Sequence, residues 1–275
     1  MNKISNERKK QILSMMVEGM SLRSISRITD THRTTIMKLM VRIGKGCEKL
    51  LEDNMKGFHS KYLQADEIWT FVGKKEKRLS KEEMKNPEIG DQYVFVALDA
   101  ESKLIPVFTV GKRTHNTTEQ FISALKSKLN GNGRIQLTTD QFKPYTVVVE
   151  DQFGMDIDYA QQTKYYTADP IGPGRYSPPR VSEVVSKKMQ GNPNEDQITT
   201  SHVESHNLTM RMSLRRFTRL CTGYSKKLEN LKASVALYFA YYNFARIHSS
   251  LKMTPAMQAG ITDHIWKWDE ILAYE

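Results

Sequence analysis

The stretch QADEIWTFVGKKEKR, residues 64–78, sets two acids directly before an apolar run that ends in a burst of lysine. Ile68, Trp69 and Phe71 are typical of a strand in the core of a sheet. Carboxylates are seldom buried without a partner or a metal ion. Asp66, at the beginning of this strand, therefore indicates a functional site as well as a fold.

The chain after residue 61 reads as strands and helices of a mixed α/β domain. We expect a strand at 62–73, a hairpin of two strands across 92–113, a helix at 116–130, a strand at 133–141, a helix at 142–154 and a strand at 155–162. Three strands in series, then a helix, then two strands with a helix between them, is the order of a ribonuclease-H-like mixed sheet with flanking helices. In that order the first and fourth strands are neighbours.

Three acids fall at positions where this order could bring them together. Asp66 lies on the first strand, Asp140 in LTTDQFKPY ends the fourth, and Glu204 in HVESHN heads a helix expected at 203–220. Three adjacent carboxylates cannot all stay ionised without compensation, which a divalent metal such as Mg²⁺ supplies. Singly, each acid has a structural reading as a turn, N-cap or first-turn residue. Jointly, they predict a metal site for phosphoryl transfer.

Other polar residues near these acids receive different interpretations. Glu67 should face the other side of its strand, and Asp99 belongs to the DAESK turn. His202 and His206 flank Glu204 but do not form an HExxH zinc motif, so they are candidates for outer contacts or for DNA contacts.

Basic and amide side chains close to the acids are candidates for phosphate binding. On the expected helix, Asn207, Arg211 and Arg215 would share the face of Glu204. Lys74 and Lys75, with further basic residues to 78, would add positive charge at the far end of the first strand.

The N-terminal segment is more basic than the rest of the chain. The net charge is +10 and the pI about 9.4. Residues 1–60 hold 12 Lys or Arg against 6 Asp or Glu, so a polyanion such as nucleic acid is the expected partner.

Helices expected at 6–19, 22–29 and 32–43 follow a helix-turn-helix pattern, with Ser21 as an N-cap and a turn at Asp30. The alternative is an ordinary three-helix bundle with a solvated basic surface. The residues expected to contact DNA from this unit are Arg27, Arg33, Thr34, Thr35 and Lys38.

These patterns predict an organisation of the whole chain. We expect an all-α helix-turn-helix domain at 1–50, a linker at 51–61 and a catalytic domain at 62–275 with a Pro-rich loop at about 162–201. No apolar run reaches 18 residues and no signal peptide is recognised, so neither membrane nor secretion is expected. The two cysteines form no CxxC pair, which fits a reducing cytoplasm.

Several motifs resemble, in order, the DDE transposases of bacterial insertion sequences, most closely the IS-one group. They are ADEIWTFVGKK, TTDQFKPY, HVESHNLTMRMSLRRFTRL, YYNFARIHSSL and TPAMQAGI, and the resemblance covers residues of about 60–262. Members of that group often carry a cysteine zinc finger before the helix-turn-helix, which this chain lacks.

The resemblance implies a chemistry and its partners. Asp66, Asp140 and Glu204 would be the triad and would bind Mg²⁺, with Mn²⁺ as a substitute. The enzyme would cut the ends of its element with water and join the freed 3′-OH to target DNA. Its partner would be double-stranded DNA in the nucleoid, bound as a homodimer or higher oligomer. Two alternatives stay open, namely a non-catalytic DNA-binding regulator and a nuclease that cuts without joining.

Overall fold

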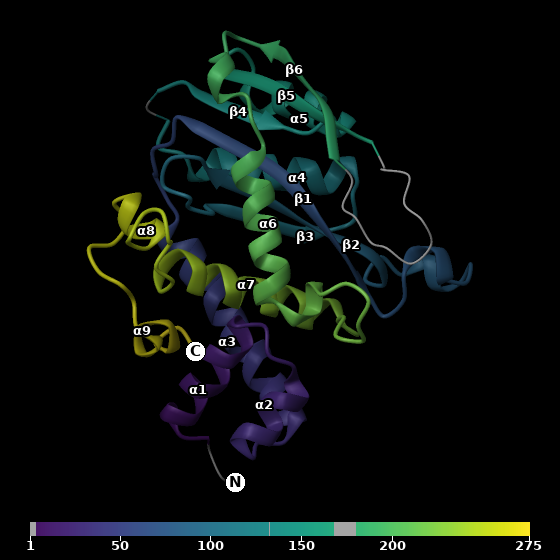
Figure 1. Cartoon of the computed structure of the whole chain (residues 1–275), viewed down its shortest axis with the longest axis vertical. Helices are drawn as coiled ribbons and strands as arrows, with labels where there is room; N and C mark the ends of the chain where they lie inside the picture. The colour runs from purple at the N-terminus through teal and green to yellow at the C-terminus, as the bar shows by residue number, and fades with distance from the viewer. Residues whose placement is uncertain (1–3, 132, 168–179) are drawn as a thin grey trace.

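The computed structural model describes residues 4–131, 133–167 and 180–275, in which a six-stranded mixed sheet lies between helices (Figure 1). The strands are β1 (Tyr62–Val72), β2 (Gly90–Asp99), β3 (Val107–Gly111), β4 (Ile135–Thr139), β5 (Ile157–Thr167) and β6 (Arg180–Gln190). The helices are α1 (Asn6–Val17), α2 (Leu22–Thr29), α3 (Arg33–Asn54), α4 (His115–Lys128), α5 (Lys143–Phe153), α6 (Ser201–Ser213), α7 (Leu228–Phe244), α8 (Pro255–Gln258) and α9 (Trp268–Leu272).

The sheet has the order β3-β2-β1-β4-β5-β6. β2 is antiparallel to β1 and β3, whereas β1, β4 and β5 are mutually parallel, and β6 returns antiparallel to β5. The expected mixed α/β order and the expected contact between the first and fourth strands are therefore confirmed.

β1 is much longer than its neighbour β4. β1 pairs with β2 from Leu63 to Val72, but with β4 only over 62–64. Beyond that point β4 has ended, and within the described ranges this edge of β1 meets only an isolated bridge from Val72 to Ser225. Asp66 lies on β1 just past the last of these pairs, and Asp140 directly follows the end of β4.

The region expected as a Pro-rich loop at 162–201 contains regular structure, which corrects that prediction. β5 continues to Thr167, and β6 pairs with it from Arg180 to Gln190. The segment RVSEVVSKKMQ has β-branched residues and no proline, which suits a strand. The prolines that favoured a loop lie mostly in 168–179, outside the described residues.

The helix expected at 203–220 is shorter than predicted. α6 ends at Ser213, and Arg215 begins a separate 3₁₀ turn, η4 (Arg215–Phe217). Leu214 between them is extended, with φ −116° and ψ 108°. Arg215 therefore does not lie on the helical face of Glu204, and that prediction is wrong.

The three N-terminal helices match their predicted positions, and the buried residues of α3 include Ile36, Leu39, Met40 and Ile43. Ser21 caps α2 as expected, and Ser5 caps α1. α3 continues past the expected boundary at residue 50, so residues 51–54 form its last turn and do not begin a linker.

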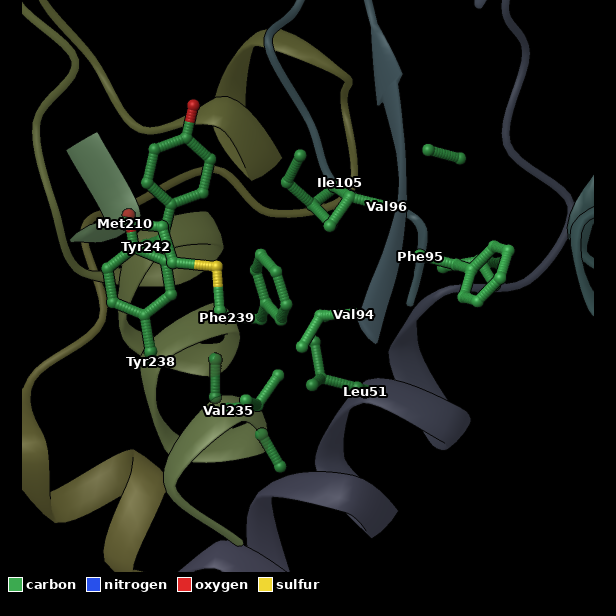
Figure 2. Packing of buried hydrophobic residues seen from close by; sticks show 14 of the residues in the cluster. Leu51, Val94, Phe95, Val96, Ile105, Met210, Val235, Tyr238, Phe239 and Tyr242 are labelled. Atoms are coloured by element: carbon green, nitrogen blue, oxygen red, sulfur yellow. The ribbon is translucent and has the colours of Figure 1, made fainter. Parts of the chain in front are cut away.

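α7 is the central helix of the molecule. It is buried on nearly every side, because it lies between α3, α6 and the sheet (Figure 1). Phe239 packs on Phe108 of β3 with ring centroids 4.8 Å apart. Figure 2 shows Leu51 of α3 and Val94 of β2 in the same cluster as Phe239. One hydrophobic core thus joins the N-terminal helices to the sheet.

Among the described residues, none of the helices combines the length and the apolar character needed to cross a bilayer.

Candidate functional site

The carboxylates of Asp66, Asp140 and Glu204 line one open pocket of about 780 Å³. The pocket lies beyond the end of β4, between β5 and the first turns of α5 and α6. The structure therefore brings the three predicted acids together. The carboxyl ends of parallel strands are a usual position for ligand sites in α/β folds.

α6 is held against β1 next to Asp66. The Oε1 atom of Gln64 accepts hydrogen bonds from the backbone N–H groups of His202 and Val203, both at 3.0 Å. Because these are unsatisfied donors at the start of the helix, Gln64 caps α6 from the sheet. One helical turn after Glu204, Asn207 donates its Nδ2–H to Asp66 Oδ2 at 2.8 Å. The two elements are thus joined on both sides of the acid.

Asp66 is an acid in an unfavourable position for its charge. Burial, followed by the nearby charges of Asp140 and Glu204, raises its pKa to about 6. Its hydrogen bonds to Asn207 and to the backbone of Glu67 oppose this rise. A buried group of this kind, in a pocket with other acids, is typical of a functional site.

Asp140 is oriented by two donors. Its Oδ1 accepts the backbone N–H of Phe142 at 2.9 Å, and its Oδ2 lies 3.1 Å from Nη2 of Arg113. The guanidinium of Arg113 also stacks on the Phe142 ring, 3.9 Å from its centroid. Asp140 is therefore fixed in one orientation before any ligand arrives.

Glu204 is paired with a cation from the neighbouring strand. Lys164 of β5 donates to its Oε2 at 2.6 Å, and the Thr200 hydroxyl donates to its Oε1 at 2.7 Å. Gln162 holds the segment before the helix by accepting from Thr200 N–H and donating to Ile198 carbonyl.

Glu67 comes closer to the acids than the alternation of the strand predicted. Ligand oxygens of Asp66, Glu67 and Asp140 all lie within 4.8 Å of one another. Glu67 does face the side opposite Asp66, where it pairs with Arg113 at 3.0 Å and lies near the Tyr145 hydroxyl. Burial, followed by the Asp140 charge, raises the pKa of Glu67 to about 7. Glu67 therefore belongs to the acid cluster, although the sequence analysis did not include it among the site residues.

The donor set suits a hard divalent cation. Every candidate ligand is a carboxylate oxygen, and Mg²⁺ and Mn²⁺ prefer oxygen ligands. The half-buried Asp66 carboxylate, which has other acids close to it, is a group that such an ion would stabilise. Asp66 and Asp140 fit this role by proximity. Glu204 lines the same pocket but lies outside the compact group of three acids.

The residues predicted to bind phosphate separate into distinct positions. Asn207 is buried and donates a hydrogen bond to Asp66, so it positions that acid and is not available at the surface to bind phosphate. Arg211 lies half-buried beside the open edge of β1, with Nη1 3.5 Å from the Trp69 carbonyl. Arg215 is exposed in η4. Lys74 pairs with Glu83, and Lys75 lies over the Trp69 ring at 5.4 Å.

The two histidines and Asp99 have clear positions. His206 is 4% exposed and lies among aromatic rings of α7, and burial lowers its pKa to about 3. It can contact neither DNA nor a ligand in the pocket, which corrects its prediction, whereas His202 is exposed. Asp99 accepts hydrogen bonds from Ser60 and Ser102, as its structural interpretation predicted.

The predicted DNA contacts of α2 and α3 are exposed. In Figure 1, α2 lies at the opposite end of the molecule from β5 and β6. Arg23, Ser26, Arg27 and Arg33 line a hollow of about 300 Å³ between the two helices. The Thr34 hydroxyl lies 2.8 Å from His32 Nδ1, near the start of α3. The remaining predicted contacts, Thr35 and Lys38, are also exposed on α3.

Sequence reasoning missed two cations of the pocket, Arg113 and Lys164. Arg113 ends the hairpin segment VFTVGKR, and Lys164 lies in the outer half of β5. Neither has a local motif, because their roles depend on which strand ends meet in space. A basic residue at each of two strand ends near a predicted acid was the only signal available.

Comparisons with known proteins identify no close relative. No protein-family description matches the chain, and no curated protein matches it. Among solved structures, it is similar to the Mos1 strand transfer complex at 13% identity and a TM-score of 0.26, over 58% of this chain and 59% of the Mos1 chain. It is also similar to the piggyBac transposase synaptic complex with hairpin DNA, at 12% identity and a TM-score of 0.39, over 94% of this chain and 70% of that one. The chain thus spans less than two thirds of the Mos1 chain, and scores at this level do not establish a common fold.

Proposed function

We propose that this protein is a DNA transposase of the DDE type, which cuts and joins the ends of an insertion sequence by metal-dependent phosphoryl transfer. The observation that carries this proposal is the meeting of Asp66, Asp140 and Glu204 in one pocket beside the end of β4. The ribonuclease-H-like strand order and the sequence resemblance to the IS-one group support it. Its site of action would be DNA in the cytoplasm.

Different residues of the pocket would bind the metal ions and the DNA phosphate. A bound Mg²⁺ or Mn²⁺ pair would activate the attacking oxygen and stabilise the leaving one. Asp66, Asp140 and Glu204 would hold these ions, and Glu67 would support Asp140 through Arg113. Lys164, which pairs with Glu204, would be available to a DNA phosphate if a cation bound that carboxylate instead.

The N-terminal helices would supply DNA recognition. We propose residues 1–50 as a helix-turn-helix unit that reads the terminal inverted repeats, with α3 in the major groove. Because α3 also packs on α7, this unit would be rigidly connected to the pocket. Binding two DNA ends at once requires at least two copies of the chain.

A strand-transfer assay tests the proposal. The chain is incubated with Mg²⁺, target plasmid and duplexes carrying the inverted repeats that flank its gene. A transposase yields joined products, a simple nuclease yields cleavage without joining, and a DNA-binding regulator yields a stable complex and neither product. Absence of joined product with binding intact would overturn the proposal.

Arg33→Ala and Lys38→Ala, made in the full chain, should weaken DNA binding in different ways. Arg33 lies exposed at the start of α3 and is expected to contact a base edge. Its loss should remove roughly 1–3 kcal/mol of discrimination between repeat and shuffled duplexes. Lys38, about one turn further on, should weaken binding to both duplexes alike. Fluorescence anisotropy at fixed salt measures both ratios, and equal discrimination in wild type and Arg33→Ala would contradict this assignment.

Arg211→Ala should make the salt dependence of DNA binding shallower. Its guanidinium is half-buried near Asp66 and has no acid partner within ion-pair distance among the described residues. One lost phosphate contact should reduce the log–log slope by about 1. Arg134→Ala is the matched control, because that guanidinium already binds Asp158 and two carbonyls. An equal change in both variants would argue against a phosphate role for Arg211.

A further inference from the structure

β6 is the outermost strand of the sheet, and it is exposed on both faces. All side chains from Arg180 to Lys188 are exposed, including Val184 at 49% and Val185 at 37%. Tyr165, on the adjacent β5 opposite Glu183, is 49% exposed. No described strand pairs with the outer edge of β6. An open edge with exposed β-branched residues is a template for pairing with another strand.

The regular part of this edge is short and is bounded on both sides. Register shifts interrupt the β5–β6 pairing near Ser182 and near Met189. Between them, Glu183–Lys188 is an uninterrupted strand. Bulges and lysines on an edge strand usually discourage unwanted pairing. Any partner must therefore fit this six-residue segment and neutralise its lysines.

The segment is complementary to itself. In an antiparallel pair of identical strands, opposite residues share one side of the sheet, so a two-fold axis must pass through a residue. An axis at Val185 places Glu183 opposite Lys187 of a second copy, and Lys187 opposite Glu183. Val185 then lies opposite Val185 of the second copy, and Val184 lies opposite Ser186 of the second copy. Moving the axis to Val184 or to Ser186 loses both charge pairs.

We propose that β6 is a homodimer interface, in which two copies of the chain pair antiparallel about Val185 and join their sheets edge to edge. The charges select this register, because Glu183 is the acid within the regular segment that can offset Lys187. In each copy, Val185 and Tyr165 lie on the same face of the joined sheet. Across the axis, these side chains of one copy would shield those of the other from solvent. β5 carries both the Tyr165 of this interface and the Lys164 of the acid pocket. The inference does not depend on the proposed function, because association can be measured without DNA.

Charge reversal tests the register in the full-length chain. Sedimentation equilibrium without DNA should show a dimer for wild type. Glu183→Lys or Lys187→Glu alone would set like charges opposite each other twice and should weaken dimerisation at least tenfold. The double variant Glu183→Lys/Lys187→Glu should restore it. Met155→Glu, at a side chain that is 76% exposed outside β6, is the control and should stay dimeric.

Disulfide trapping tests the axis itself. The two Val185 Cα atoms would lie about 4.5–5.5 Å apart, within reach of a disulfide, whereas two Ser186 Cα atoms would be about 8 Å apart. In a Cys221→Ser background, with Cys47 buried, Val185→Cys should cross-link under mild oxidation and Ser186→Cys should not. A monomeric wild type would overturn the proposal and leave the edge for a strand of another protein. A dimer that neither single charge reversal weakens would place the interface elsewhere.

Discussion

Asp66→Asn should abolish metal-dependent DNA cleavage and, in metal-free buffer at pH 7.5, should raise the thermal stability of the protein. Removal of one carboxylate from the pocket should lower the cleavage rate by at least about 10³-fold, since the proposed reaction would depend on the ion that this carboxylate would hold. The stability gain arises because the ionised Asp66 is a cost to the folded state. Both effects would have the same origin, which is a carboxylate charge that the folded chain disfavours and a bound cation would stabilise.

The sign and size of the stability effect follow from the pKa of Asp66, which is about 6 in the folded chain against an ordinary 3.8. Between these values the folded state binds more protons than the unfolded state, so stability falls as pH rises from 3.8 to 6 and is constant above. The full difference is about 3 kcal/mol. Burial of the new amide group costs part of this free energy. We therefore expect a net rise in Tm of roughly 2–6 °C at pH 7.5. The gain should shrink as the pH falls below about 6, where Asp66 becomes protonated in the folded chain.

Differential scanning calorimetry with EDTA, paired with a cleavage assay, checks both halves of this result. Asp99→Asn is the control, because Asp99 is an even more buried acid that accepts hydrogen bonds from Ser60 and Ser102. Its loss should lower the Tm. Asp140→Asn and Glu204→Gln should also abolish cleavage. Wild-type cleavage by Asp66→Asn, or a fall in its Tm equal to that of Asp99→Asn, would assign Asp66 a structural role instead.

The acid site could be predicted largely from local sequence because its parts lie at ends of regular elements. Asp66 and Asp140 were placed by strand order alone, since the first and fourth strands of this topology are neighbours. Glu204 was placed by the helix that follows. Arg113 and Lys164 could not be found in this way, because each reaches the acids from a strand whose end is defined only by the folded sheet.

The predictions that failed have physical reasons in the long-range packing. The sequence predicts a helix to residue 220, yet the extended Leu214 ends α6 at Ser213. It predicts His206 as a candidate for outer contacts or DNA contacts, but the ring packs on Phe239 and Tyr242. It predicts a loop where β6 lies, because neighbouring prolines dominate the composition of the segment. In each case a tertiary contact outweighed a local preference.

The boundary between the N-terminal helices and the sheet domain is the most consequential of these differences. α3 lies against α7. At Gly44 the two helices approach closely enough to leave no room for a side chain. A Cβ built on Gly44 would lie 2.5 Å from both Cα and Cβ of Ala233. Trp268 of α9 also donates to Ser14 of α1 at 2.7 Å. The N-terminal helices are therefore expected to unfold together with the sheet.

Gly44→Ala should strongly destabilise the whole chain, although alanine has the higher helix propensity. The propensity gain is roughly 1 kcal/mol, whereas the added methyl group meets the backbone of α7 and must push two packed helices apart. Overpacking of this kind costs about 1–3 kcal/mol and more when the backbone cannot yield. We expect a net loss of about 2 kcal/mol in the free energy of unfolding, measured by urea denaturation and seen equally by probes in both regions. Lys49→Ala, exposed on the same helix, is the control and should change little. A Gly44→Ala protein as stable as wild type would show that α3 can leave α7, and that the N-terminal helices form a separate domain after all.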